Sequence, residues 1–131
     1  MTNFNGTLLE ENAILSTKNR GYAYGDMLFE TIKFSGGKIL FWEDHYFRLM
    51  ASMRIMRMEI PMNFTMEFLE NEIRKTLEAN GFNKVTSRVK LTVHRNEGGF
   101  YTPSTNNVSF IISANEIHDD FYLIKEGFYE V

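Results

Sequence analysis

The sequence has no cysteine, no long apolar run and no surplus of positive charge. Without cysteine it forms neither disulfides nor thiolate metal sites, and it has no cysteine nucleophile. No apolar run approaches the ~20 residues that span a membrane, and no charged leader with an apolar stretch opens the chain. We therefore expect neither a membrane protein nor a secreted one, and a cytoplasmic location follows by default.

The slight excess of acidic residues argues against a further class of function, nucleic-acid binding. The 17 Asp and Glu residues outnumber the 14 Lys and Arg residues, which gives a formal net charge of -3. A nucleic-acid-binding protein needs a basic surplus to neutralise phosphates, so nucleic acid is not an expected partner. The histidines His45, His94 and His118 are far apart in the sequence and lack metal-ligand spacing, so we expect no metal site.

The chain of 131 residues, 44% of them hydrophobic and 24% charged, fits one globular domain. Period-two patterns and turn residues predict strands, and apolar residues at helical spacing predict two helices. We expect a hairpin over 4–15, strands over 28–35 and 38–41, helices over 42–57 and 65–80, strands over 85–95 and 107–114, and a final hairpin over 121–131. This order predicts an α+β domain with a mostly antiparallel sheet and two main helices on one face.

Local signals set details of these elements. The Gly36-Gly37 pair suits a tight hairpin turn. Thr65 is the expected N-cap of the second helix, and Gly81 is expected to end it. In the first helix, four residues fall on one face and are expected to point inward: His45, Leu49, Met53 and Met56.

A glycine-hinged loop, Arg20-Gly21-Tyr22-Ala23-Tyr24-Gly25-Asp26, leads into a strand that begins with Phe29-Glu30-Thr31. Glycine accepts positive φ and lets a ligand or another chain approach closely. Polar, aromatic and small residues at the start of a strand are typical of a small-molecule pocket. Taken alone, the same residues also suit a tight turn without further function.

A second motif, Asp44-His45-Tyr46-Phe47-Arg48-Leu49, follows the predicted hairpin. In their order and spacing, the two motifs resemble the N-terminal domain of class IV (fold-type IV) aminotransferases, and the resemblance extends from Asn5 to the C-terminus. This family uses pyridoxal 5'-phosphate and includes branched-chain and D-amino-acid aminotransferases and aminodeoxychorismate lyase. The resemblance implies an α+β fold like that N-terminal domain, a small-molecule amino acid substrate and a homodimer.

Arg48 lies near the predicted helix N-terminus, where a guanidinium and free backbone N–H groups can share an anion. The resemblance implies that Arg48 binds the phosphate of the cofactor. The alternative is an exposed arginine that pairs with Asp44 at i, i+4, which would contribute little stability.

The resemblance also implies substrate contacts at Tyr24, Phe29, Glu30, Arg88 and Arg95. Tyr24 would donate its hydroxyl to a substrate carboxylate, Phe29 would form an apolar wall, and Glu30 would sit beside the reacting centre. Because strand residues alternate, Phe29 and Glu30 must point to opposite faces, so at most one points directly into the pocket. The alternative places Phe29 in the core and Glu30 in solvent.

Arg88 shares its sheet face with Lys90, Thr92 and His94, and a face this polar lies either in solvent or along a wet site. The resemblance implies that Arg88 helps to bind a substrate carboxylate. Arg95 begins a segment over 95–103 that looks like the arginine-and-glycine loop of the family. In the family this loop closes over the pocket and reaches toward the neighbouring subunit.

Two positions depart from the family's pattern. Asn19 stands where the family usually has aspartate, and Met27 stands where it has a small residue, commonly glycine. Met27 would crowd the mouth of the strand.

The groups that complete the cofactor site are missing from this sequence. Pyridoxal phosphate catalysis needs a lysine that carries the cofactor and an acid group at its pyridine nitrogen, and in the family both belong to the C-terminal domain. None of the lysines here matches that position: Lys18, Lys33, Lys38, Lys75, Lys84, Lys90 and Lys125. We therefore expect residues 1–131 to be the N-terminal domain of a longer enzyme or a domain that persists without catalysis.

Two alternatives to an aminotransferase stay open at this point. One is aminodeoxychorismate lyase, which removes pyruvate with the same cofactor. The other is a non-catalytic oligomerisation or ligand-binding domain, in which Arg48 and Arg88 would be dispensable.

Overall fold

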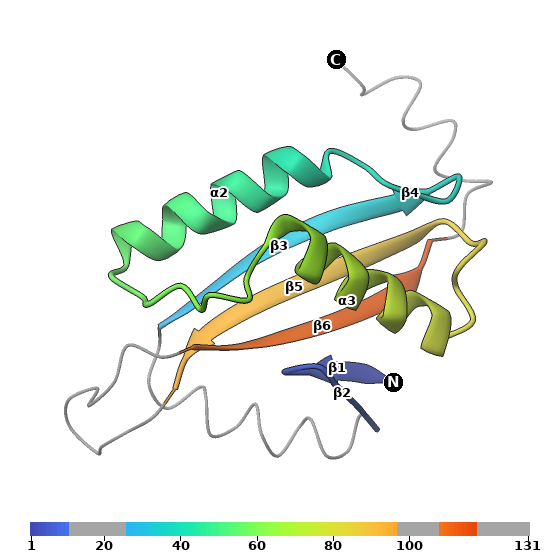
Figure 1. Ribbon diagram of the computed structural model, residues 1–131. Helices are drawn as coiled ribbons and strands as arrows, with labels where there is room; N and C mark the ends of the chain where they lie inside the picture. The colour runs from blue at the N-terminus through green and yellow to red at the C-terminus, as the bar shows by residue number, and fades with distance from the viewer. Residues whose placement is uncertain (11–25, 97–107, 118–131) are drawn as a thin grey trace.

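The structure is a computed structural model that describes residues 1–10, 26–96 and 108–117. Its strands form one six-stranded sheet in the order β2-β1-β6-β5-β3-β4, and every neighbouring pair is antiparallel. The strands are β1 (Thr2–Phe4), β2 (Thr7–Leu9), β3 (Met27–Ser35), β4 (Lys38–Ile39), β5 (Ser87–Arg95) and β6 (Val108–Glu116). Two helices, α2 (Trp42–Ile55) and α3 (Met66–Ala79), lie on the same face of the sheet (Figure 1). The predicted α+β fold is confirmed.

Both hairpins are built on turn residues with positive φ. Gly36 and Gly37 have φ values of 60° and 78°, and Phe34 pairs with Ile39 across them. A two-residue turn with both φ values positive matches the twist of the flanking strands. The first hairpin turns at Asn5 and Gly6 in the same way, with φ values of 53° and 93°.

Strand β4 is shorter than the predicted span of 38–41. It ends at Ile39, and Phe41 has a φ of 54°, which interrupts the extended backbone directly before α2. As a result, β3 pairs with β4 only at Phe34 and Ser35. Among the described strands, the first half of β3 therefore forms an edge of the sheet.

The predicted second helix is confirmed together with its caps. The hydroxyl oxygen of Thr65 accepts a hydrogen bond from the backbone N–H of Phe68 at 3.0 Å. Gly81 follows the helix with a φ of 73°, the left-handed conformation that favours glycine.

The predicted inward face of the first helix is correct except at its end. Leu49 and Met53 are buried, but Met56 is 36% exposed, so its predicted inward orientation is wrong. The physical reason is that α2 ends at Ile55 and Arg57 takes a φ of 56°, so the chain leaves the helix before Met56 can extend its apolar stripe.

The core lies between the helices and one face of the sheet. Alternate strand residues point into it from the sheet, among them Ile32 of β3, Leu91 of β5 and Ile112 of β6. Leu69 and Ile73 of α3 pack into the core from the helix side and are fully buried. The predicted final hairpin over 121–131 and the stretch at 13–15 lie outside the described residues.

Candidate functional site

Glu30 projects from β3 to the helix-covered side of the sheet and meets two side chains of α2 there. The guanidinium of Arg48 donates from Nε to Glu30 Oε2 at 3.0 Å and from Nη2 to Glu30 Oε1 at 2.8 Å. The ring Nδ1 of His45 lies 2.6 Å from the same Oε1 atom. The side chain of Glu30 is 9% exposed, whereas that of Arg48 is 61% exposed. We call Glu30, His45 and Arg48 the β3–α2 cluster.

The geometry assigns the protons in this cluster. An ionised carboxylate only accepts hydrogen bonds, so the short contact to Glu30 requires the proton of His45 to sit on Nδ1. Burial alone raises the pKa of Glu30, but hydrogen bonds from Arg48 and His45 outweigh it and hold that pKa below its ordinary value. The hydrogen bond to Glu30 raises the pKa of Arg48. At neutral pH the cluster is therefore an ion pair.

One edge of the Arg48 guanidinium remains available. Nε and Nη2 point to Glu30, while Nη1 has no hydrogen-bond partner among the described residues. The surface pair with Asp44, considered from the sequence, is not formed, because Glu30 is the carboxylate that Arg48 binds. A fixed and partly solvated guanidinium with a free N–H edge is suited to a carboxylate or a phosphate.

The opposite face of the sheet carries two of the other predicted residues, Phe29 and Arg88. Phe29 is 58% exposed there, and the Nζ atom of Lys90 lies 4.8 Å from the centroid of its ring. Thr31 pairs with Lys90 and Lys33 pairs with Arg88, so these side chains share one face. Phe29 and Glu30 thus point to opposite faces, as the strand period predicts. The alternative of Phe29 in the core and Glu30 in solvent is wrong.

This second face is cationic. In the described strands it presents Lys33, Arg88 and Lys90 without an aspartate or glutamate on the same face. Arg88 and Lys90 are exposed. An aromatic ring beside exposed cations is suited to an anionic small molecule with an apolar part. The prediction that Arg88 binds a substrate carboxylate agrees with this placement and stays a prediction.

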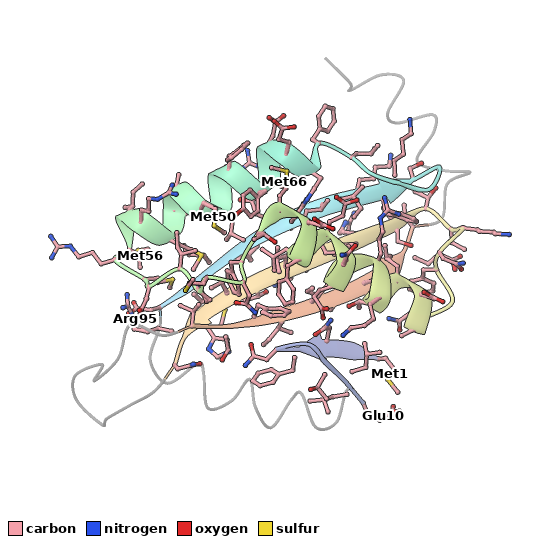
Figure 2. The ribbon with its side chains drawn as sticks, in the orientation of Figure 1. Met1, Glu10, Met50, Met56, Met66 and Arg95 are labelled. Atoms are coloured by element: carbon pink, nitrogen blue, oxygen red, sulfur yellow. The ribbon has the colours of Figure 1, made fainter. Side chains whose placement is uncertain are left out.

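Arg95 connects three segments of the fold. Its Nε donates to Asp26 Oδ2 at 2.9 Å, and its Nη2 donates to the backbone carbonyl of Met56 at 2.7 Å. Its side chain is only 11% exposed. Figure 2 shows Arg95 and Met56 at the same end of the molecule, where α2 stops. These contacts tie the end of β5 to the residue before β3 and to the end of α2.

Tyr24, the rest of its glycine-hinged loop up to Gly25, Asn19 and most of the segment after Arg95 lie outside the described residues. The predicted substrate contacts of Tyr24 and Arg95 therefore stay predictions. Met27 is partly buried at the start of β3.

Sequence reasoning missed the link between Glu30 and Arg48, although the sequence holds a signal for it. Glu30 alternates with Ile32 and Phe34, which face the helices. His45 and Arg48 are three residues apart and so share a helix face. A buried carboxylate needs such partners.

The structure shows neither a metal centre nor a membrane segment in the part of the chain that it describes. No group of three or more His, Cys, Asp and Glu side chains is arranged to hold a metal ion there. No helix in the same ranges has the length and apolar character needed to cross a membrane.

Comparison with known proteins identifies the family. The family model described as amino-transferase class IV matches residues 27–128, more than half of the chain. The D-alanine aminotransferase of Staphylococcus haemolyticus is 27% identical over 121 residues, which cover 88% of this chain and 42% of that protein. The D-alanine aminotransferase of Listeria monocytogenes serotype 1/2a (strain 10403S) is 33% identical over 92 residues, which cover 70% of this chain and 30% of that protein.

A solved structure shares the fold. The branched-chain amino acid aminotransferase of Escherichia coli superposes with a TM-score of 0.73 at 20% identity, covering 88% of this chain and 39% of that one. Another branched-chain amino acid aminotransferase with the same fold was solved with pyridoxamine 5'-phosphate. The chain spans less than half the length of these relatives. It belongs to the class IV aminotransferase family, whose members depend on pyridoxal 5'-phosphate.

Proposed function

We propose that this chain is the N-terminal domain of an amino acid aminotransferase that uses pyridoxal 5'-phosphate. In this proposal, residues outside the chain supply the lysine that carries the cofactor and the acid group at its pyridine nitrogen. The family match and the shared fold support the proposal. The observation that carries it is the guanidinium of Arg48, which is fixed by Glu30 and keeps its Nη1 edge free of partners among the described residues.

The residues of the β3–α2 cluster fit a phosphate group. The donors at the free edge of Arg48 are suited to two phosphate oxygens, and its exposure gives a ligand access. When bound, pyridoxal phosphate supplies an electron sink that makes bonds at the α-carbon of an amino acid easier to break. The role of Arg48 is to bind and orient the phosphate end, not to take part in bond breaking.

In this proposal, the two faces of the site meet at the first half of β3, which has a described strand on one side only. Glu30 and Arg48 lie on one face there, and Phe29 lies on the other, one residue away along the chain. We assign to Phe29 the apolar wall beside the substrate, and to Arg88 a hydrogen-bonded contact with a carboxylate. Tyr24 joins this set through the resemblance of its motif to the family's.

The two kinds of relative bear differently on the substrate. The relatives that match by sequence include D-alanine aminotransferases that are 27% and 33% identical. The branched-chain enzymes match by fold at lower identity. We therefore propose a D-amino acid as the first substrate to test and a branched-chain amino acid as the second. A homodimer, which rests on the resemblance to the family, and a cytoplasmic location, which is the default expectation, complete the proposal.

The test uses the product of the complete gene. Its bound cofactor should change absorption spectrum when D-alanine or a branched-chain amino acid is added. Arg48→Gln should weaken binding of pyridoxal phosphate, whereas Arg54→Gln, a control in the last turn of the same helix, should not. No spectral change with any amino donor would refute the aminotransferase. Pyruvate release from aminodeoxychorismate would instead identify the lyase, and a protein that binds no cofactor would point to a non-catalytic domain.

A further inference from the structure

We infer that Glu30 is a positioning residue, which holds Arg48 in the one orientation that presents its Nη1 edge to a phosphate. The identity of that phosphate as part of pyridoxal phosphate rests on the proposed function. The inference replaces the sequence-based expectation that Glu30 contacts the substrate. Its side chain points to the helix-covered side of the sheet, away from Phe29 and Arg88.

The carboxylate is held more firmly than the arginine that it binds. Glu30 lies within β3, paired with Leu91 of the neighbouring strand, and its side chain is almost completely buried. His45 adds a contact at 2.6 Å to Oε1 and limits rotation of the carboxylate. Arg48 has a long and mostly exposed side chain, which would sample many rotamers without this anchor.

The pattern of hydrogen bonds fixes the direction of the guanidinium. Its Nε and Nη2 atoms form one edge of the planar group, and both donate to Glu30. Because the group is planar and rigid, this two-point contact determines where the Nη1 edge points. A single hydrogen bond would leave the guanidinium free to rotate about that contact.

A carboxylate beside an arginine also has an opposite effect, because its negative charge repels a phosphate. The two effects predict opposite outcomes when Glu30 is neutralised. If positioning dominates, the affinity for phosphate falls. If repulsion dominates, the affinity rises. Three features of the structure favour positioning: the carboxylate is on the far side of the guanidinium from the free edge, His45 donates a hydrogen bond to it, and the outer edge is screened by solvent.

The experiment compares Glu30→Gln with Glu70→Gln in the complete gene product after removal of bound cofactor. Glu70 is a matched control because it pairs with Arg74 in an exposed contact on α3. Affinities for pyridoxal phosphate and for inorganic phosphate are measured by calorimetry. NMR of the Arg48 Nε–H signal reports whether the side chain is held in the absence of ligand. Arg48→Lys provides a second test that leaves the buried carboxylate in place, since lysine keeps the charge but cannot form the two-point contact.

We expect Glu30→Gln and Arg48→Lys to weaken binding of both ligands by about two- to tenfold, the equilibrium factor for immobilising one flexible side chain. The protected Arg48 Nε–H signal should disappear in Glu30→Gln, and Glu70→Gln should match the wild type. Unchanged or tighter binding by Glu30→Gln would overturn the inference, and so would a wild-type protein that binds no phosphate. Phosphate binding that depends on Glu30, without turnover of any amino acid, would support the inference while refuting the proposed aminotransferase.

Discussion

Replacing Arg95 with methionine separates a structural role of this arginine from a role in substrate binding. The described contacts favour the structural role, because Arg95 donates to Asp26 and to the carbonyl of Met56 and is only 11% exposed. Hydrogen bonds to charged groups contribute about 1.5–3 kcal/mol each. Asp26 is 38% exposed, and water will solvate it in the variant. We therefore expect Arg95→Met to lower the free energy of local unfolding by about 2 kcal/mol in total.

Hydrogen exchange of the β3 and β5 amides in the complete gene product measures this loss, since Met27 pairs with His94 next to the contact. Asp26→Asn keeps an acceptor for Arg95 and should cost about half as much. The double variant should cost less than the sum of the two single variants, because each single variant already weakens or removes the contact between Arg95 and Asp26. If Arg95→Met instead keeps wild-type exchange rates and raises the KM for the amino acid, Arg95 binds substrate and our reasoning is refuted.

Three further predictions concern the fold and its pH dependence. Thr65→Ala should lower the free energy of unfolding by about 1 kcal/mol through loss of the helix cap, measured in urea; Thr65→Ser should preserve it. Leu69→Ala should cost about 2–5 kcal/mol because the side chain is fully buried, and a smaller loss would mean that the core collapses around the cavity. The pKa of Glu30 is lowered in the folded protein, so the ionised carboxylate stabilises the fold. This contribution to the free energy of unfolding is complete above pH 4.5, the ordinary pKa, and is lost as the pH falls through the lowered pKa of the folded protein. Glu30→Gln should therefore flatten the acid limb of a stability–pH curve, and an unchanged limb would contradict this assignment.

The elements that sequence analysis predicted well are those with local causes. The Gly36-Gly37 turn depends on positive φ, and the N-cap of Thr65 depends on a hydrogen bond within three residues. Both signals lie inside the segment that they shape. The end of α2 was placed two residues too late because Arg57 gives no local sign that it will adopt positive φ.

The order of the strands had no such local cause. Strand β1 pairs with β6, with Asn3 opposite Ile112, although these residues lie at opposite ends of the sequence. Asn3 is fully buried, and its side chain donates to Glu72 and accepts from the N–H of Gly6. A polar residue at a core position gives no hydrophobic signal. Only the assembled fold shows the partners that make its burial possible.

The β3–α2 cluster falls between these two cases. The strand period indicates that Glu30 faces the helices, and a carboxylate there requires a cationic partner. The sequence offers His45 and Arg48 on one helix face, so the pairing could be derived without coordinates, but the free Nη1 edge could not. An ion pair contributes little net stability, whether its partners are exposed or are buried and compared with apolar substitutes. Replacing Glu30 and Arg48 together with apolar residues should therefore leave the fold intact and remove phosphate binding, and that result would mean that the pair serves the ligand more than the fold.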